Sequence, residues 1–240
     1  MLFSQDIGID LGTANTLVFV KGKGIVIREP SVVAIDKNTG KILQVGAAAR
    51  NMLGRTPGNV VAMKPLREGI ISDHEMTVSL LQALFRSANK SSVFTPKPRV
   101  VISVPSGVSE VEERSVINAA LEAGARRVFL IEEPLAAALG AGLDIKGAKG
   151  HMVVDIGGGT TDIAVLSMSG VAVSSSLKVA GDHMDDLIAR YVRRQHGLAI
   201  GQVTAESVKI QIGRVYTGAD EISMNVKGRD FKTGMPKMVT

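Results

Sequence analysis

The chain has 240 residues, a length typical of one large domain or two small ones. Hydrophobic residues make up 45% of it and the formal net charge is +5, so it can form a core and is not intrinsically disordered. It has no cysteine, which excludes a disulfide scaffold and a thiolate metal site. With no Trp and basic residues that are spread rather than clustered, we expect no nucleic-acid partner. No apolar stretch approaches the length of a transmembrane helix, and the N-terminus lacks a secretory signal pattern, so we expect a cytoplasmic protein.

The first predicted element is a β-meander. An apolar strand ends in Asp10, a loop of Gly, Thr and Asn follows, and a second apolar strand runs to Val20. A third strand is predicted over residues 24–27. The meander therefore carries a polar loop at its first turn.

The middle of the chain alternates helices and strands. A capping box over residues 72–75 predicts a helix with one apolar face, formed by Met76, Leu80, Leu81, Leu84 and Phe85. A buried strand is predicted over 100–104, and a second capping box over 109–112 opens a helix that ends near Gly124. A further strand over 128–131 leads to a small-residue helix that starts at Leu135. This order predicts an α/β domain with helices packed on a mixed sheet.

The opening meander recurs 145 positions later. Residues 154–165 again place an apolar strand that ends in an aspartate (Asp155) before a loop of Gly, Thr and Asp, and a third strand is predicted over 170–173. Two similar halves that face each other would aim both loops at one cleft.

Both loops have the chemistry of a polyphosphate site. Glycines let the backbone approach phosphate, and Thr and Asn side chains add neutral donors. An aspartate beside these donors would repel phosphate unless a cation lay between them, and Mg²⁺ commonly takes one or two carboxylates together with phosphates. We therefore predict that Asp10 and Asp155 hold one hydrated Mg²⁺. The alternative for a single copy is ordinary hairpin-turn chemistry, but two copies in equivalent places favour the phosphate site. No Walker or Rossmann motif is present.

Two glutamates follow the strand over 128–131. A carboxylate there could align a water molecule on a terminal phosphorus, as phosphoryl transfer to water requires. The alternative is that one of them caps the next helix, with Pro134 at its first position. We expect one structural and one functional residue among Glu132 and Glu133, and the pattern alone does not decide which.

Three motifs resemble those of a known superfamily. Residues 8–16 (GIDLGTANT), 131–138 (IEEPLAAA) and 155–162 (DIGGGTTD) are similar to the first phosphate, connecting and second phosphate motifs of the actin, sugar-kinase and heat-shock chaperone ATPases. Within it the chain resembles the MreB family of bacterial actins. The resemblance also covers segments around Gly22, Glu29, Gly54, Gly201 and Gly228, and spans essentially the whole chain.

The resemblance implies ATP and Mg²⁺ as cofactors. Asp10 and Asp155 would hold the Mg²⁺ shell, Glu133 would position the attacking water with Glu132 beside it, and Thr161 would help to hold that water. Glu206 and Lys209, one turn apart on a helix, would contact ribose and adenine; the alternative for this pair is an exposed ion pair worth a few tenths of a kcal/mol. The residues implied around the phosphates are Gly12, Thr13, Ala14, Asn15, Gly157, Gly158, Gly159 and Thr160.

The implied fold is that of an actin-like ATPase, with two RNase H-like domains that flank a nucleotide cleft. We expect domain I over residues 1–145, with a small subdomain over about 31–75, and part of domain II over 146–240, with a small subdomain over about 182–240. The family continues for about another hundred residues, with a further glycine-rich motif that closes over the adenosine. We therefore expect domain II to be incomplete at the C-terminus.

The resemblance also implies a cytoskeletal ATPase with slow, polymerisation-linked hydrolysis. Its filaments would be antiparallel pairs on the inner face of the cytoplasmic membrane, where they would organise cell-wall synthesis with membrane proteins of the elongation machinery and maintain rod shape. Val93 and Phe94 lie in a polar loop with three nearby cations, which suits membrane contact. The alternative is that Phe94 packs on the core.

Two other function classes remain open on the same fold. One is a monomeric kinase or chaperone ATPase, but the length leaves no room for a chaperone's further domains and no extra motif indicates a sugar pocket. The other is a scaffold that binds nucleotide without hydrolysing it.

Overall fold

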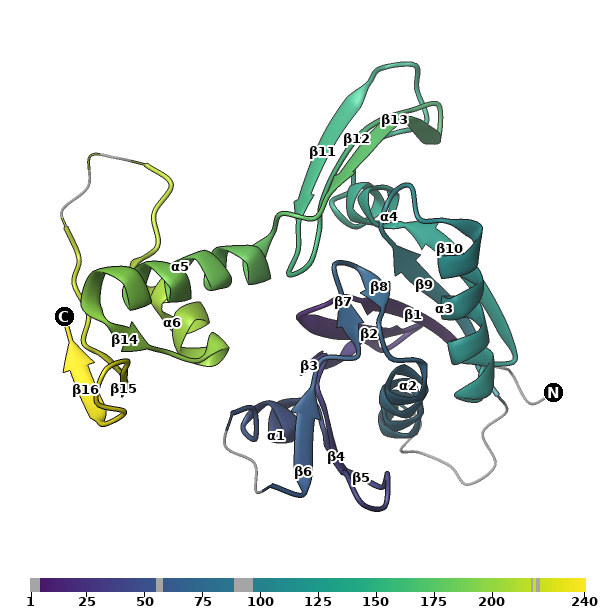
Figure 1. Ribbon diagram of the computed structural model, residues 1–240. Helices are drawn as coiled ribbons and strands as arrows, with labels where there is room; N and C mark the ends of the chain where they lie inside the picture. Colours follow the sequence, from purple (N-terminus) through teal and green to yellow (C-terminus); the bar gives the residue numbers. More distant parts are fainter. Residues whose placement is uncertain (1–4, 55–57, 89–96, 217, 219–220) are drawn as a thin grey trace. The chain divides into compact units, whose positions relative to one another are not determined.

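The computed structural model describes residues 5–54, 58–88, 97–216, 218 and 221–240 (Figure 1). The chain divides into two compact units, Met1–Lys178 and Val179–Thr240, and each is described here by itself. The predicted division into domains over 1–145 and 146–240 stays a prediction.

A five-stranded mixed sheet forms the centre of the first unit. The first three strands form the predicted antiparallel meander, and two later strands run parallel to β1, which gives the order β10-β9-β1-β2-β3. The strands are β1 (Asp6–Leu11), β2 (Asn15–Val20), β3 (Gly24–Pro30), β9 (Arg99–Val104) and β10 (Arg127–Glu132). The mixed sheet of the sequence prediction is confirmed. The carboxyl ends of β1, β9 and β10 lie together at one edge because these strands are parallel.

Two helices, α2 (His74–Ala88) and α3 (Glu110–Glu122), contribute to the main core, and they pack against each other (Figure 1). The predicted apolar face of α2 is confirmed, because all five of its residues are buried: Met76, Leu80, Leu81, Leu84 and Phe85. The apolar side chains that join this core alternate along both strands: Ile7, Ile9 and Leu11 on β1, and Val100, Ile102 and Val104 on β9.

The predicted start of α3 is confirmed and that of α2 is wrong in one detail. Ser109 and Glu112 form both bonds of a capping box at α3. At α2, by contrast, Asp73 Oδ1 accepts the Met76 N–H at 3.0 Å, whereas Ser72 Oγ donates to the Pro65 carbonyl. Aspartate and serine are comparable N-cap residues, so the pattern could not separate these neighbours.

A smaller sheet follows the first meander. It has the order β5-β4-β6 and consists of β4 (Val33–Asp36), β5 (Ile42–Val45) and β6 (Val60–Met63), with the short helix α1 (Ala47–Arg50). Val32, Ala34, Ala49 and Val60 form its own core. The chain then makes a two-stranded hairpin, β7 (Leu66–Arg67) and β8 (Ile70–Ile71), before it enters α2.

The second predicted meander is also present in the first unit. It forms a separate antiparallel sheet of β11 (His151–Ile156), β12 (Thr161–Ser167) and β13 (Gly170–Leu177). Helix α4 (Glu133–Gly140) contacts β9 and β10 of the large sheet as well as β11 and β12. It buries Ala138 with Ala164 and Leu166, and so joins the two sheets.

The second unit contains two helices and a small sheet. Helices α5 (Gly181–His196) and α6 (Gln202–Ile212) pack together, and the sheet has the order β14-β15-β16. Its strands are β14 (Leu198–Ala199), β15 (Val226–Asp230) and β16 (Pro236–Val239). Val192, Leu198, Val208 and Val226 form the core of this unit.

The main core makes a direct prediction. Leu81 is fully buried between α2 and the sheet, so Leu81→Ala removes buried methyl groups and leaves a cavity. We expect it to lower the free energy of unfolding by about 3 kcal/mol in urea denaturation. Leu121→Ala is the control, because Leu121 on α3 is 43% exposed and should change stability by less than about 0.5 kcal/mol. Equal losses for the two variants would contradict the assignment of the core.

Candidate functional site

Asp10 and Asp155 occupy equivalent positions in the two meanders. Each is the residue before the last of its strand, and each pairs across the hairpin with the following strand, Asp10 with Leu17 and Asp155 with Asp162. The repeat in the sequence is therefore also a repeat of register. The first loop (residues 12–14) and the second loop (residues 157–160) follow directly.

The two loops touch each other. A Cβ atom placed on Gly158 would lie 2.6 Å from Ala14 Cβ and 3.1 Å from Ala14 N, and one placed on Gly159 would overlap Thr13 Oγ1. Real Cβ atoms essentially never approach another atom within 3.0 Å, so a side chain at either position would require a shift of the loops. Glycine at these two positions is thus what allows the loops to approach.

The turn between β7 and β8 contacts both loops. The Gly69 N–H donates to Thr13 Oγ1 at 3.0 Å, and a Cβ on Gly69 would lie 2.9 Å from Thr160 Cγ2. Gly69 and Glu68 have φ values of +77° and +50°, a left-handed backbone that is uncommon for a non-glycine residue such as Glu68. Glu68 also forms a 3.1 Å ion pair with Lys178, directly after β13. The turn therefore ties the first loop to the second meander.

Four carboxylates lie beside the loops, and three of them have a raised pKa. Partial loss of hydration raises the pKa of Asp10, although its side chain stays accessible from one side; a hydrogen bond from Ser103 opposes this effect and the charge of Asp155 adds to it. Burial and then the charge of Asp162 raise the pKa of Asp155. Burial, with the charges of Asp162, Asp10 and Asp155, raises the pKa of Glu133 to about 8. Asp10 and Asp155 are thus near enough to interact, and Glu133 lies within reach of their field.

These residues fit a Mg²⁺ ion bound together with phosphate. Repulsion between Asp10 and Asp155 favours a cation beside them, and the accessible side of Asp10 leaves room for a ligand. Within the part of the chain that the structure describes, no three His, Asp or Glu side chains form a metal-binding group by themselves. Mg²⁺ suits such a site, because it usually takes one or two carboxylates and completes its shell with water and substrate phosphates.

The other predicted loop residues lie in the same region. Gly12 packs against the Asn15 carbonyl, and Asn15 is exposed at the start of β2. The Gly157 N–H donates to the Thr160 carbonyl at 2.9 Å, which closes the second loop. Thr13 and Thr160 are buried, whereas Thr161 is half-buried at the start of β12.

The end of β9 supplies site residues that the sequence analysis missed. Ser103 Oγ donates to Asp10 Oδ1 at 3.2 Å, and Ser106 Oγ donates to Glu132 Oε2 at 2.8 Å. The Ser106 N–H donates to Asp162 Oδ1 at 2.9 Å, and the Asp162 side chain is buried. The sequence offered one sign of the role of Ser103: it is the single polar residue in the otherwise apolar run over 100–104.

Glu132 and Glu133 have different environments. Glu132 occupies the N-cap position of α4 but its side chain makes no bond to the helix, so the expected side-chain cap is wrong. That side chain accepts the Ser106 hydroxyl instead. Glu133 is the first residue of the helix. Burial and the negative charges of the three aspartates (Asp162, Asp10 and Asp155) raise its pKa. The geometry therefore separates one supporting glutamate from one beside the acidic cluster.

Lys209 and Glu206 lie on α6 in the second unit. Lys209 Nζ forms a 2.8 Å ion pair with Asp185 Oδ1 and donates to the Gly181 carbonyl at 2.9 Å. Asp185 is only 2% exposed, and its pKa is raised by burial, lowered by Lys209, and raised by the nearby charges of Glu206 and Asp182. The structure thus gives Lys209 a buried partner from α5, in addition to its predicted neighbour Glu206.

The two predicted membrane-contact residues, Val93 and Phe94, lie outside the described residues. In the described ranges, none of the helices is both long enough and apolar enough to span a bilayer.

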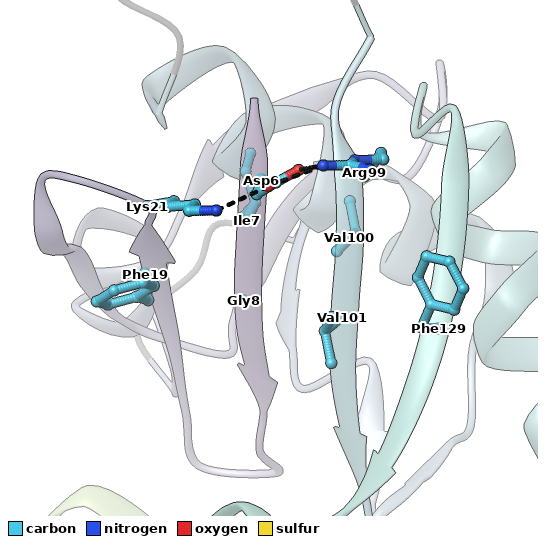
Figure 2. A pocket seen from close by; sticks show the side chains of 9 residues that line it. All are labelled: Asp6, Ile7, Gly8, Phe19, Lys21, Arg99, Val100, Val101 and Phe129. Atoms are coloured by element: carbon cyan, nitrogen blue, oxygen red, sulfur yellow. Dashed lines mark hydrogen bonds and ion pairs between the residues drawn. The ribbon is translucent and has the colours of Figure 1, made fainter. Parts of the chain in front are cut away.

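A cavity of about 400 Å³ lies at the opposite end of the large sheet (Figure 2). Gly8 stands between Phe19 and Val101 in one row across the strands, so its missing side chain leaves a hollow. An ionic rim borders it, formed by Asp6 with Lys21 and Arg99. None of the predicted site residues within the described ranges lines this cavity, and we do not assign it to the phosphate site.

The chain matches the family model "MreB/Mbl protein" over residues 4–240. It is 52% identical over 239 residues to the cell shape-determining protein Mbl of Bacillus cereus, in an alignment that covers 100% of this chain and 72% of the relative. It is 49% identical over 243 residues to the cell shape-determining protein MreB of Escherichia coli K12, in an alignment that covers 100% of this chain and 70% of the relative.

Solved structures of related proteins have the same fold as this chain. The structure of MreB5 of Spiroplasma citri bound to AMPPNP has a TM-score of 0.90 and 42% identity, over 98% of this chain and 71% of that chain. The structure of the same protein bound to ADP has a TM-score of 0.91, over 100% of this chain and 71% of that chain. The predicted actin-like fold is thereby confirmed, in a chain that spans about 70% of its relatives' length. On this evidence, the chain belongs to the MreB/Mbl family of bacterial actins.

Proposed function

We propose that this chain is an actin-like cytoskeletal ATPase that binds Mg·ATP at the two loops and assembles into filaments that determine cell shape. The convergence of the two glycine-rich loops with Asp10, Asp155 and Glu133 carries this proposal. The MreB5 structures bound to AMPPNP and ADP support nucleotide binding. The names of the Mbl and MreB relatives support a role in cell shape.

The phosphates would lie against the loops. Asp10 and Asp155 would hold Mg²⁺, which when bound offsets the negative charge of the phosphates. Backbone N–H groups of residues 158–160, with Thr13 and Asn15 of the first hairpin, would donate to phosphate oxygens. Because the loops already touch, little further ordering of them would be needed when nucleotide binds.

Glu133 would accept a hydrogen bond from the attacking water and align it with the γ-phosphorus, with Thr161 as a second contact. Water would add to phosphorus and give a proton to the Glu133 carboxylate, the bond from phosphorus to the β–γ bridging oxygen would break, and ADP and phosphate would leave. The pKa of about 8 belongs to the metal-free chain, in which the Glu133 carboxyl keeps its proton at neutral pH. A cation beside Asp10 and Asp155 would offset their charges and lower this pKa, which would leave a carboxylate able to act as a general base. Glu132 is bound to Ser106 and would support the helix start rather than contact water.

In the second unit, Glu206 and Lys209 would contact the ribose and adenine. The buried carboxylate of Asp185 holds the Lys209 ammonium group in place. The expected division into domain I over residues 1–145 and domain II over 146–240 is part of this proposal.

The cellular part of the proposal follows the family. Filaments would be antiparallel pairs that bind the inner face of the cytoplasmic membrane through Val93 and Phe94. There they would organise cell-wall synthesis with membrane proteins of the elongation machinery and so maintain rod shape. ATP-dependent light scattering combined with phosphate release tests this function. Filaments with slow phosphate release support it; sugar-dependent ADP formation would indicate a kinase, and filaments without phosphate release a scaffold.

The role of Glu133 makes a kinetic prediction. Glu133→Gln keeps the size of the side chain but removes the base, so ATP hydrolysis should fall about 100-fold or more. The dissociation constant of Mg·ATP, measured by calorimetry, should change by less than about threefold, a margin of about 0.6 kcal/mol. Glu132→Gln is the matched control and should keep most of the activity. If Glu132→Gln lost as much activity as Glu133→Gln, the assignment of the two roles would be wrong.

The raised pKa of Glu133 makes a prediction for stability in the absence of metal and nucleotide. Between pH about 4.5 and about 8 the folded chain keeps the Glu133 proton while the unfolded chain has lost it. The free energy of unfolding should therefore fall as the pH rises through this range, and Glu133→Gln should remove that part of the fall. We expect a difference of about 2 kcal/mol between pH 5 and pH 8, which allows for the partial exposure of the side chain. Parallel urea denaturation curves for the two proteins at both pH values check this, and equal pH dependence would contradict it.

A further inference from the structure

Ser106 is a buried polar residue at the site that the proposed reaction does not use. It lies in the turn after β9 and is only 5% exposed. Its two donors reach different motifs: the hydroxyl donates to Glu132, 26 positions later, and the backbone N–H donates to Asp162, 56 positions later. One residue thus links the connecting motif to the second phosphate motif.

Both acceptors are carboxylates, which makes these bonds stronger than bonds between neutral groups. Ser106 Oγ lies 2.8 Å from Glu132 Oε2, and Ser106 N lies 2.9 Å from Asp162 Oδ1. The hydroxyl has one proton to donate, so the bond to Glu132 uses its whole donor capacity. Asp162 is 1% exposed, so its bond is shielded from water.

The start of α4 has no side-chain cap of its own. Glu132 has the extended backbone of an N-cap residue, but its side chain makes no bond to the helix. The Glu132 side chain is instead fixed from outside by the Ser106 hydroxyl. Because Glu133 is the next residue, the anchor at Glu132 limits how the first turn of α4, and with it the Glu133 carboxyl, can shift.

From these contacts we infer that Ser106 is a positioning residue for Glu133: its hydroxyl anchors the start of α4 through Glu132, while its backbone N–H holds Asp162 of the second meander. The inference rests on the proposed ATPase function. It adds a residue that acts on Glu133 through Glu132. Catalysis depends steeply on such placement, since an error of about 1 Å can cost about 100-fold in rate.

The test compares four forms of the full 240-residue chain: wild type, Ser106→Ala, Ser106→Thr and Ser109→Ala. Ser106→Ala removes the bond to Glu132 and keeps the backbone N–H to Asp162. Ser106→Thr keeps a hydroxyl. Ser109→Ala is the matched control, because it removes a serine hydroxyl that also binds a glutamate, in the capping box of α3.

We expect kcat for ATP hydrolysis to fall about tenfold to a hundredfold in Ser106→Ala, with the affinity for Mg·ATP unchanged. Ser106→Thr should recover most of that loss, and Ser109→Ala should lower thermal stability without lowering kcat. An unchanged kcat in Ser106→Ala, an equal fall in Ser109→Ala, or a loss confined to affinity would each overturn the inference.

A second readout needs no activity. Amide hydrogen exchange of the peptide over residues 131–140, measured without nucleotide, should be faster in Ser106→Ala than in wild type or Ser109→Ala. If wild type did not hydrolyse ATP, the proposed function would fail, and this comparison would still decide whether Ser106 anchors α4. Unchanged exchange in Ser106→Ala would overturn the anchoring.

Discussion

Repulsion between carboxylates is the constraint on which this site depends. Asp10 and Asp155 come from two strands, Asp162 from a third and Glu133 from a helix start. Burial, and then the charges of neighbours in this group, raise the pKa of Asp10, Asp155 and Glu133. Such a group is stable only where protons, donors or a cation offset the charge. The chain uses donors from Ser103 and Ser106 and a proton held on Glu133 at neutral pH, and the accessible side of Asp10 leaves a place for a cation.

The glycines make this arrangement geometrically feasible. Gly158 and Gly159 bring the second loop against Ala14 and Thr13, and no side chain could occupy either position without a shift of the backbone. The buried threonines of the loops hold this contact, since the Thr13 hydroxyl accepts the Gly69 N–H. The Thr13 hydroxyl accepts in this bond and so keeps its own proton for a ligand. Asn15 and Asp10, on either side of the first loop, are accessible to a ligand.

Periodic and local features could be predicted from the sequence. The two meanders, the apolar face of α2 and the capping box of Ser109 are all present, because each depends on residues within a few positions of one another. The matching position of Asp10 and Asp155 could be predicted because the hairpin repeats.

Contacts between distant segments could not be predicted in this way. A serine after an apolar strand carries no sign of its partner, and the partners of Ser106 lie 26 and 56 positions away. The spacing of Glu206 and Lys209 along one helix gave no sign that Lys209 also forms an ion pair with the buried Asp185 of another helix. At the start of α2, two adjacent residues of similar capping strength left the choice to tertiary packing.

The central claim is that Asp10 and Asp155 serve one shared ion beside the nucleotide. Calorimetric binding of ATP with and without Mg²⁺, for wild type, Asp10→Asn, Asp155→Asn and the double variant, tests it most directly. If the ion is shared, each single variant loses most of the gain from Mg²⁺ and the double variant loses little more, with a coupling energy of at least about 1 kcal/mol. Losses that add independently would show that the two aspartates do not act on the same ion, and would contradict the account.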